Sequence, residues 1–160
     1  MKSKLTEHFT LLEVFRSRTA DALGVPNFPE GEDFLEEVLE NARALALNVL
    51  EPVREIFGPV VVNSWFRSPA VNKIVGGSPT SQHLNGSAAD VRFLEVPCRT
   101  VFLWLLDNKD IVLDQAILEK RESIWLHLSY NRLSKNRREF LVSPSTSVYL
   151  KKFKKDGPLL

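Results

Sequence analysis

Hydrophobic residues recur at helical spacing over the longest patterned segment of the chain, residues 33–57. Apolar side chains fall three or four positions apart throughout it, which places them on one face of an α-helix. We therefore expect this helix to bury that face against a sheet. Pro52 is expected to kink the helix or to separate its last turn, and Gly58 and Pro59 end it.

Three shorter helices are predicted from local signals. Thr10 and Glu13 have the spacing of a capping box, in which each side chain accepts a hydrogen bond from the other residue's backbone N–H, so a helix should begin directly after Thr10. A Ser-Pro pair supplies an N-cap and a favourable first-turn residue, and it predicts a short helix over residues 70–74. Pro97 begins a further amphipathic helix.

Short apolar runs predict four strands, over residues 60–65, 88–93, 113–119 and 124–130. The polar residues between the last two favour a hairpin. Residues 148–150 are a candidate edge strand, and residues 151–160 are expected to be loose. The pattern as a whole predicts an α+β fold, with an antiparallel sheet of about four strands and helices packed on one face.

The length of 160 residues fits one domain, and apolar and charged contents of 44% and 26% are typical of globular proteins that fold in water. We expect the core to span about residues 8–142, followed by a basic extension over residues 143–160. Cys98 is the only cysteine, which excludes an internal disulfide and a cysteine-rich zinc site.

Charge is unevenly distributed, although the formal net charge is only +1. Residues 1–50 carry five Lys or Arg against nine Asp or Glu, whereas residues 131–160 carry eight against two. The basic C-terminal end could contact an anionic polymer such as teichoic acid or a nucleic acid, or it could be a solvated tail.

Two of the three histidines are candidate metal ligands, although their spacing from Asp90 indicates little until the surrounding motif is considered. His83 and Asp90 are seven positions apart, and His127 lies on the last predicted strand, on the face opposite to its aliphatic side chains. Two imidazoles and one carboxylate leave a tetrahedral zinc ion one open position for water, as catalytic zinc sites require. We interpret His83, Asp90 and His127 as ligands of one catalytic zinc ion. The third histidine, His8, directly precedes a predicted helix, where an exposed or capping role is commoner.

The surrounding residues form a longer pattern. Residues 81–90 read Ser-x-His-x-x-Gly-x-Ala-x-Asp, and residues 125–129 read Trp-x-His-x-Ser. With residues 63–72 and the glycines that follow them, these motifs resemble the zinc peptidase family of D-alanyl-D-alanine carboxypeptidases and related peptidoglycan endopeptidases (peptidase family M15). The Hedgehog signalling domain shares that fold. The resemblance covers residues 8 to about 142, and it implies a Zn²⁺ cofactor and a peptidoglycan peptide as substrate.

The resemblance also implies a general base. Residues 114–119 resemble the family's penultimate strand, which ends in the catalytic acid, and that position is Glu119 here. Relatives place this Glu six positions before the last ligand, whereas Glu119 lies eight before His127, so the hairpin is two residues longer. Either the turn bulges out and Glu119 keeps the role, or Glu122 takes it, or the chain binds zinc without catalysis.

Two further residues match positions that contact substrate in the family. Arg67 follows the first predicted strand and resembles a substrate clamp, because a guanidinium suits a peptide carboxylate or a developing oxyanion. A structural ion pair is the other interpretation of Arg67. Ser81 is expected to hydrogen-bond the substrate.

Three functions are compatible with the sequence. The first is a zinc peptidase acting on peptidoglycan, the second a zinc-containing module that binds cell wall or another ligand without catalysis, and the third a nucleic-acid-binding virion protein. No apolar run has the length of a membrane span or of a signal-peptide core. We expect synthesis in the cytoplasm, and action on the cell wall after release or as a phage or viral virion component. A bacterial paralogue is the alternative origin.

Overall fold

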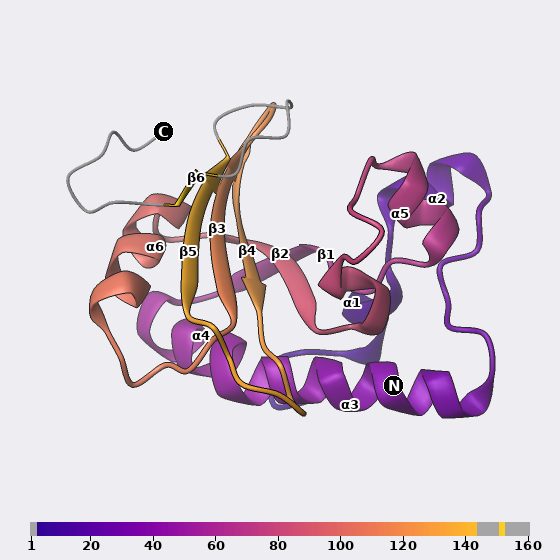
Figure 1. The fold of residues 1–160 in the computed structure, drawn as a ribbon, viewed down its shortest axis with the longest axis horizontal. Helices are drawn as coiled ribbons and strands as arrows, with labels where there is room; N and C mark the ends of the chain where they lie inside the picture. The colour runs from indigo at the N-terminus through magenta and orange to yellow at the C-terminus, as the bar shows by residue number, and fades with distance from the viewer. Residues whose placement is uncertain (1–2, 144–150, 153–160) are drawn as a thin grey trace.

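One sheet runs through the computed structural model, which describes residues 3–143 and 151–152 (Figure 1). Its strand order is β1-β2-β4-β3-β5-β6, and neighbouring strands are antiparallel except for the parallel pair β3 and β5. The strands are β1 (Val60–Ser64), β2 (Ala88–Phe93), β3 (Gln115–Lys120), β4 (Ile124–Ser129), β5 (Glu139–Ser143) and β6 (Lys151–Lys152).

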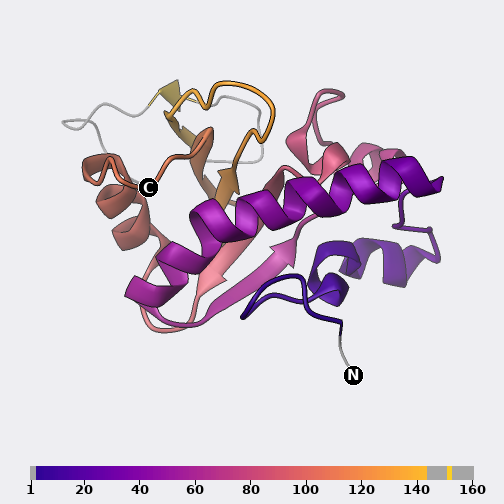
Figure 2. The ribbon, with the colours of Figure 1, turned by 90° about the horizontal axis from the view of Figure 1, so that it is seen from below.

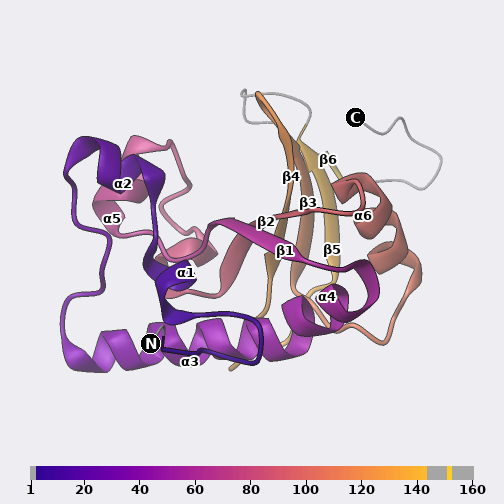
Figure 3. The same ribbon diagram turned by 180° about the vertical axis from the view of Figure 1, so that it is seen from behind.

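Helices lie beside the sheet and at one of its ends. They are α1 (Leu11–Phe15), α2 (Arg18–Leu23), α3 (Glu32–Leu45), the π-helical turn η1 (Ala46–Leu50), α4 (Glu51–Phe57), α5 (Pro69–Ile74), the 3-10 turn η2 (Gln82–Asn85) and α6 (Cys98–Asp107). Figure 2 shows α3, η1 and α4 as one rod running along the sheet. α1, α2 and α5 gather at the end away from α6 (Figures 1 and 3).

Pro52 explains why the long predicted helix has three parts. Pro52 stands in the first turn of α4, directly after the π-helical turn. Proline has no N–H to donate within the helix, and its ring would clash with the carbonyl four residues earlier. The wider π-turn accommodates the ring. The predicted kink is therefore a local widening within a continuous rod, which ends at Gly58.

The first predicted helix is broken into two. Thr10 and Glu13 form the expected capping box, so α1 begins where predicted. α1 ends at Phe15, however, and the Ser17 hydroxyl accepts a hydrogen bond from the N–H of Ala20 to begin α2. A second N-cap serine so soon after the first helix turn favours two short helices over one.

The two faces of the sheet differ in what they contact. Side chains alternate between faces along each strand, and one set packs with the helices into the hydrophobic core. That set comprises Ala89, Val91, Ala116, Leu118, Leu126, Leu128, Phe140 and Val142. The helices contribute Val38, Ala42, Leu45, Val101 and Phe102 to the same core. The α+β class is as predicted, and the face away from this core carries Asp90, Glu119 and His127.

The prediction of an antiparallel sheet of about four strands was wrong. The described residues form a mixed sheet, because β5 pairs parallel with β3, and β6 pairs with β5. The sequence concealed β5 because its three apolar residues follow a polar, basic loop without alternation. The strand expected at residues 148–150 lies outside the described residues.

The loop before β5 is fastened around the start of β3. Arg138 has a positive φ of 54°, and its backbone N–H donates to the carbonyl oxygen of Leu113. The Arg138 guanidinium donates to the carbonyl oxygens of Leu105, Asn108 and Ile111 at 2.6–2.9 Å. Because α6 ends in this region, Arg138 satisfies carbonyls that the helix leaves free and ties β5 to it.

Gly86 is expected to be essential for the fold. Its φ is +78°, and a Cβ there would lie 2.7 Å from the carbonyl oxygen of Val38 on α3. Gly86→Ala should lower the free energy of unfolding by about 2–4 kcal/mol, because a backbone clash adds to the cost of the left-handed conformation. Urea unfolding in the presence of a chelator measures this loss without a contribution from metal binding.

Gly24→Ala is the matched control. Gly24 also has a positive φ, +64°, but nothing lies within 4 Å of the position that a Cβ would take. Its substitution should cost only about 1 kcal/mol, the left-handed conformation alone. Equal losses at the two glycines would contradict the close approach between Gly86 and α3.

Candidate active site

The sheet register brings two of the predicted ligands together. Asp90 on β2 and His127 on β4 are direct cross-strand partners, on the face away from the core. His83 comes from the 3-10 turn η2, which begins directly after Ser81. The Ser81 hydroxyl accepts a hydrogen bond from the backbone N–H of His83 at 3.4 Å, so Ser81 caps the turn that carries this histidine.

Three ligand-type atoms converge beside this strand pair. His83 Nε2 lies 3.2 Å from Asp90 Oδ1 and 3.2 Å from His127 Nδ1, and His127 Nδ1 lies 3.0 Å from Asp90 Oδ1. All three side chains are buried. Over residues 3–143, this is the group of His, Cys, Asp or Glu side chains that is close enough to hold a metal ion.

The size of this triangle fits a tetrahedral zinc ion. Nitrogen and oxygen ligands lie about 2.0–2.1 Å from zinc, which places neighbouring ligand atoms about 3.3 Å apart in a tetrahedron. The three separations here, 3.0–3.2 Å, are close to that value. Three ligands fill three corners, so the arrangement leaves the fourth for water, which distinguishes catalytic from structural zinc sites.

The ring of His83 is oriented by the backbone. Its Nδ1 lies 2.6 Å from the carbonyl oxygen of Trp65, so Nδ1 donates its proton there and Nε2 directs a lone pair toward Asp90 and His127. The Trp65 indole in turn donates to the carbonyl oxygen of Gly86 at 3.0 Å. The segment before the motif thereby fixes the tautomer of the first histidine.

The electrostatics of the cluster favour a bound cation. Burial lowers the pKa of His83, so its imidazole is neutral, as a metal ligand must be. Burial alone would raise the pKa of Asp90, but interactions with His83 and Arg67 outweigh it and hold this pKa well below its usual range. The result is an ionised carboxylate beside two imidazole nitrogens.

Arg67 contacts the same carboxylate from the other side. Its Nη2 donates to Asp90 Oδ2, and its Nε donates to Ser64 Oγ at 2.9 Å. Because Arg67 engages Oδ2, Asp90 presents Oδ1 to the histidines. Arg67 and Ser81 also line the cavity in front of the cluster. Arg67 therefore forms an ion pair with Asp90 and faces the cavity at the same time.

That cavity has a volume of about 310 Å³, and the predicted base lines it together with the three predicted ligands. Its walls include His83, Asp90, His127, Arg67, Ser81, Glu119, Lys120, Arg121 and Trp125. Glu119 pairs with Trp125, two residues before His127, so Glu119 and His127 project from the same face. Diagonal neighbours of this kind are about 7–8 Å apart, which leaves space between them for a small molecule.

Glu119 and Glu122 occupy different environments. Burial raises the pKa of Glu119, and the negative charge of Asp90 raises it further, against smaller effects of His127 and Arg121. Glu122 is exposed in the hairpin turn and lines a neighbouring cavity instead. The hairpin keeps Glu119 within the sheet, since Lys120 pairs with Ile124 beyond it.

Sequence comparison identifies the family. A family model described as Peptidase M15 matches residues 7–128, a span that contains all the site residues predicted from the sequence. The chain belongs to the peptidase M15 family. It is therefore a peptidase, of a family whose members are generally zinc-dependent. The match ends within β4, before β5. A comparison with curated proteins finds no match.

In this M15 peptidase, Asp114 links the turn η2, which carries His83, to the loop before β5. Gln82, adjacent to His83, donates to Asp114 Oδ2 at 3.1 Å. Arg137 donates to Asp114 Oδ1 from its backbone N–H at 2.9 Å and from Nε at 3.0 Å. The sequence motif gave Gln82 no role, and its position next to a ligand was the one signal that pointed to it.

The basic segment after β4 is used partly inside the fold. Three of the four Lys and Arg in residues 131–143 have internal partners. Arg132 lies 2.8 Å from Glu40, Arg137 binds Asp114, and Arg138 binds backbone carbonyls.

Within residues 3–143 and 151–152, no helix is both long and apolar enough to cross a membrane.

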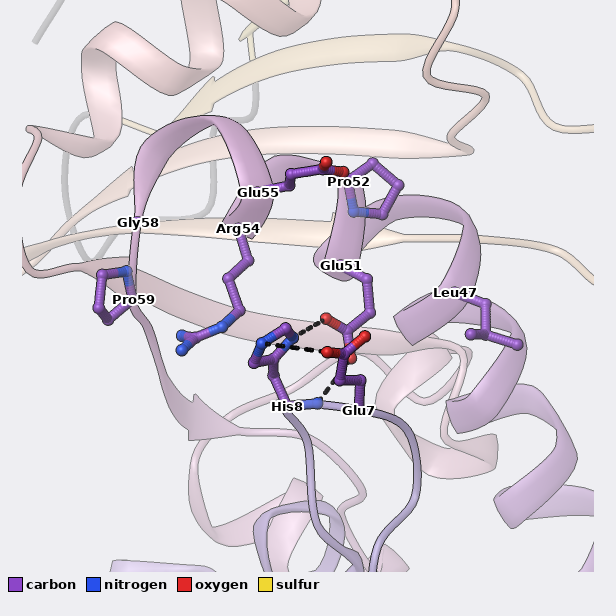
Figure 4. A pocket seen from close by; sticks show the side chains of 9 residues that line it. All are labelled: Glu7, His8, Leu47, Glu51, Pro52, Arg54, Glu55, Gly58 and Pro59. Carbon is purple, nitrogen blue, oxygen red and sulfur yellow. Dashed lines mark hydrogen bonds and ion pairs between the residues drawn. The ribbon is translucent and has the colours of Figure 1, made fainter.

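His8 lies in a separate cavity of about 620 Å³ (Figure 4). Its Nδ1 is 2.6 Å from Glu51 Oε2, and its backbone N–H donates to Glu51 Oε1 at 2.9 Å. In Figure 4 the imidazole lies between the side chains of Arg54 and Glu51. His8 thus ties the N-terminal segment to α4, and it lies apart from the three converging ligands.

Asp114→Asn is expected to lower the free energy of unfolding by about 1.5–3 kcal/mol at neutral pH, because Arg137 and Gln82 lose a charged acceptor. Burial alone would raise the pKa of Asp114, but the hydrogen bonds from Arg137 hold it below its usual value. The stabilisation is therefore complete above the unfolded pKa of about 3.9, and it is lost as pH falls through the lower folded pKa.

Urea unfolding of both proteins from about pH 7 to about pH 3 should show their difference shrinking at the acid end. Asp110→Asn, an exposed neighbour, is the control for the change in net charge. A difference that stays constant with pH would contradict the role of the Asp114 carboxylate.

Proposed function

We propose that the chain is a zinc metallopeptidase that hydrolyses peptide bonds in peptidoglycan stem peptides, as a D-alanyl-D-alanine carboxypeptidase or as an endopeptidase. One observation carries the proposal. The ligand-type atoms of His83, Asp90 and His127 lie within 3.2 Å of one another, in a cavity that Glu119 also lines. Membership of the M15 family supports the peptidase, and the motif resemblance supports the peptidoglycan substrate.

Glu119 is the proposed general base. Zinc held by the three ligands would supply a Lewis acid and lower the pKa of a water molecule to about 7. Glu119 would take a proton from the attacking water and pass it to the amine nitrogen as the C–N bond breaks. Its burial raises its pKa, which suits a group that must hold that proton between the two transfers.

Arg67 and Ser81 are the proposed substrate contacts. The pairing of Arg67 with Asp90 uses only part of its five N–H donors, and the others can bind a substrate carbonyl or carboxylate. Ser81 Oγ accepts from the N–H of His83, which leaves the hydroxyl proton for a substrate oxygen. Each residue would then orient a metal ligand and the substrate together. The proposed substrate lies in the cell wall, reached after release or as part of a virion.

The purified protein is expected to bind about one zinc ion per chain, and a chelator should abolish peptide hydrolysis until zinc is added back. His127→Ala should remove tight binding, because it deletes one of three ligands. Titration calorimetry on the metal-free proteins measures the zinc stoichiometry of the wild type and the zinc affinity of the variant. His8→Ala is the control, since His8 lies in the other cavity. Unchanged affinity in His127→Ala would contradict the assignment.

Glu119→Gln is expected to lower kcat by about 10²–10⁴, because the amide cannot accept a proton. Zinc content should remain unchanged, which separates the base from the ligands. Glu122 is exposed in the loop between β3 and β4, so Glu122→Gln should keep a rate near that of the wild type. The measurement is release of products from purified muropeptides, followed by mass spectrometry.

The reverse result, with Glu122→Gln inactive and Glu119→Gln active, would transfer the role to Glu122. Zinc binding without any product from the wild-type protein would favour the non-catalytic wall-binding module.

A further inference from the structure

A second cavity, of about 700 Å³, adjoins the one in front of the metal ligands. Asp90 and Trp125 line both cavities, so these two residues stand between them. From there the first cavity extends toward Glu119 and Ser81, and the second extends toward β1 and the N-terminal helices. The metal-ligand cluster therefore lies beside a junction, with open space on both sides.

β1 forms one wall of the second cavity. Residues 60–63 line it, and β1 is at the edge of the sheet of described residues. An edge strand presents N–H and C=O groups with which an extended peptide can pair. Ser64, the last residue of β1, lies opposite Asp90 in the strand register. A peptide that follows β1 is therefore led to the metal ligands.

Cationic side chains line both cavities. Lys120 and Arg121 line the first, and Arg16, Arg18 and Arg92 line the second. Arg121 is held over the ring of Trp125, 5.9 Å from its centroid, within cation–π distance. The second cavity also contains three carboxylates, of Glu13, Asp90 and Glu122. With Arg67 and Glu119 of the first cavity included, six cations stand against four carboxylates over the two cavities, an excess that suits a peptide carrying carboxylate groups.

We propose that the protein is an endopeptidase that binds an extended, anionic peptide across both cavities, with the scissile bond at their junction. The inference rests on the proposed zinc peptidase activity and narrows its substrate. The oxygen of water bonds to the carbonyl carbon, the C–N bond breaks, and the water's proton passes to the amine, so that two peptides result. A carboxypeptidase needs space for only one terminal residue on one side, whereas both sides are open here.

The test uses synthetic peptides. The bond cut in purified peptidoglycan is first located by mass spectrometry. Acetylated and amidated peptides are then made with that bond and with one, two or three residues on each side. We expect kcat/KM to rise by about tenfold or more on lengthening either side, because residues on both sides contact the protein.

Val61→Trp is the variant that blocks the second cavity. Val61 faces the same side of the sheet as Asp90, and tryptophan is well tolerated in strands. We expect it to abolish the gain from lengthening on one side, by about tenfold, and to leave the shortest peptide and the other side unchanged. Val112→Trp, at an exposed valine outside both cavities, is the matched control. Zinc content and circular dichroism report folding, and Arg92→Ala probes the same cavity if Val61→Trp misfolds.

The outcomes separate this inference from the activity on which it rests. Release of a single residue from free C-termini, with amidated peptides refused, would overturn the endopeptidase and leave the zinc peptidase intact. Equal effects of Val61→Trp and Val112→Trp, with Arg92→Ala inert, would overturn the use of the second cavity. No hydrolysis of any peptide by the zinc-loaded protein would overturn the peptidase proposal and this inference with it.

Discussion

The candidate site depends on the register of one antiparallel strand pair, β2 with β4. Asp90 and His127 oppose each other in that register, and the residues on either side of them point into the core. A slip of one residue would turn one ligand to the opposite face of the sheet. The apolar partners Ala89, Val91, Leu126 and Leu128 prevent this, since they would have to leave the core. Hydrophobic burial on one face therefore sets the geometry of the candidate metal ligands on the other.

The segment after β1, which contains Trp65 and Arg67, contacts the motif that carries His83 and Asp90. The Trp65 carbonyl orients the His83 ring, and the backbone N–H of Arg67 donates to the His83 carbonyl oxygen at 3.0 Å. The Arg67 side chain then reaches Asp90. Trp65 and Arg67, just after β1, thereby hold two candidate ligands from different elements. One connected set of contacts therefore joins this segment to the ligand motif.

The sequence was informative where structure follows from local spacing. The capping box of α1, the strand over Ala88–Phe93 and the helix after Ser68 all follow from short patterns, and the structure has them. The grouping of His83, Asp90 and His127 came from motif resemblance, because no spacing rule brings positions so far apart into contact. Glu119 could be named, but its distance from His127 along the chain left Glu122 as an alternative. The hairpin register places Glu119 within β3 and Glu122 in the turn, which supports the proposal of Glu119 as the base.

Other features could not be predicted because they depend on tertiary contacts. β5 follows a polar loop, and its pairing with β3 relies on Arg138 reaching carbonyls near the end of α6. Gln82 has no assigned role in the motif, yet its hydrogen bond to Asp114 joins the turn of His83 to the residue that precedes β3. The cation–π contact of Arg121 with Trp125 likewise appears only when the hairpin is folded.

The position of β5 has a consequence for how the protein avoids self-association. β3 carries Glu119, and β5 covers its outer backbone, so that β3 is an interior strand. Without β5, β3 would be an apolar edge strand with unpaired N–H and C=O groups, which could pair with a strand of another copy of the chain. A chain that ended where the family match ends would keep the metal ligands but lose that cover. The parallel strand β5 thus keeps the backbone of β3, next to the candidate site, paired within the chain.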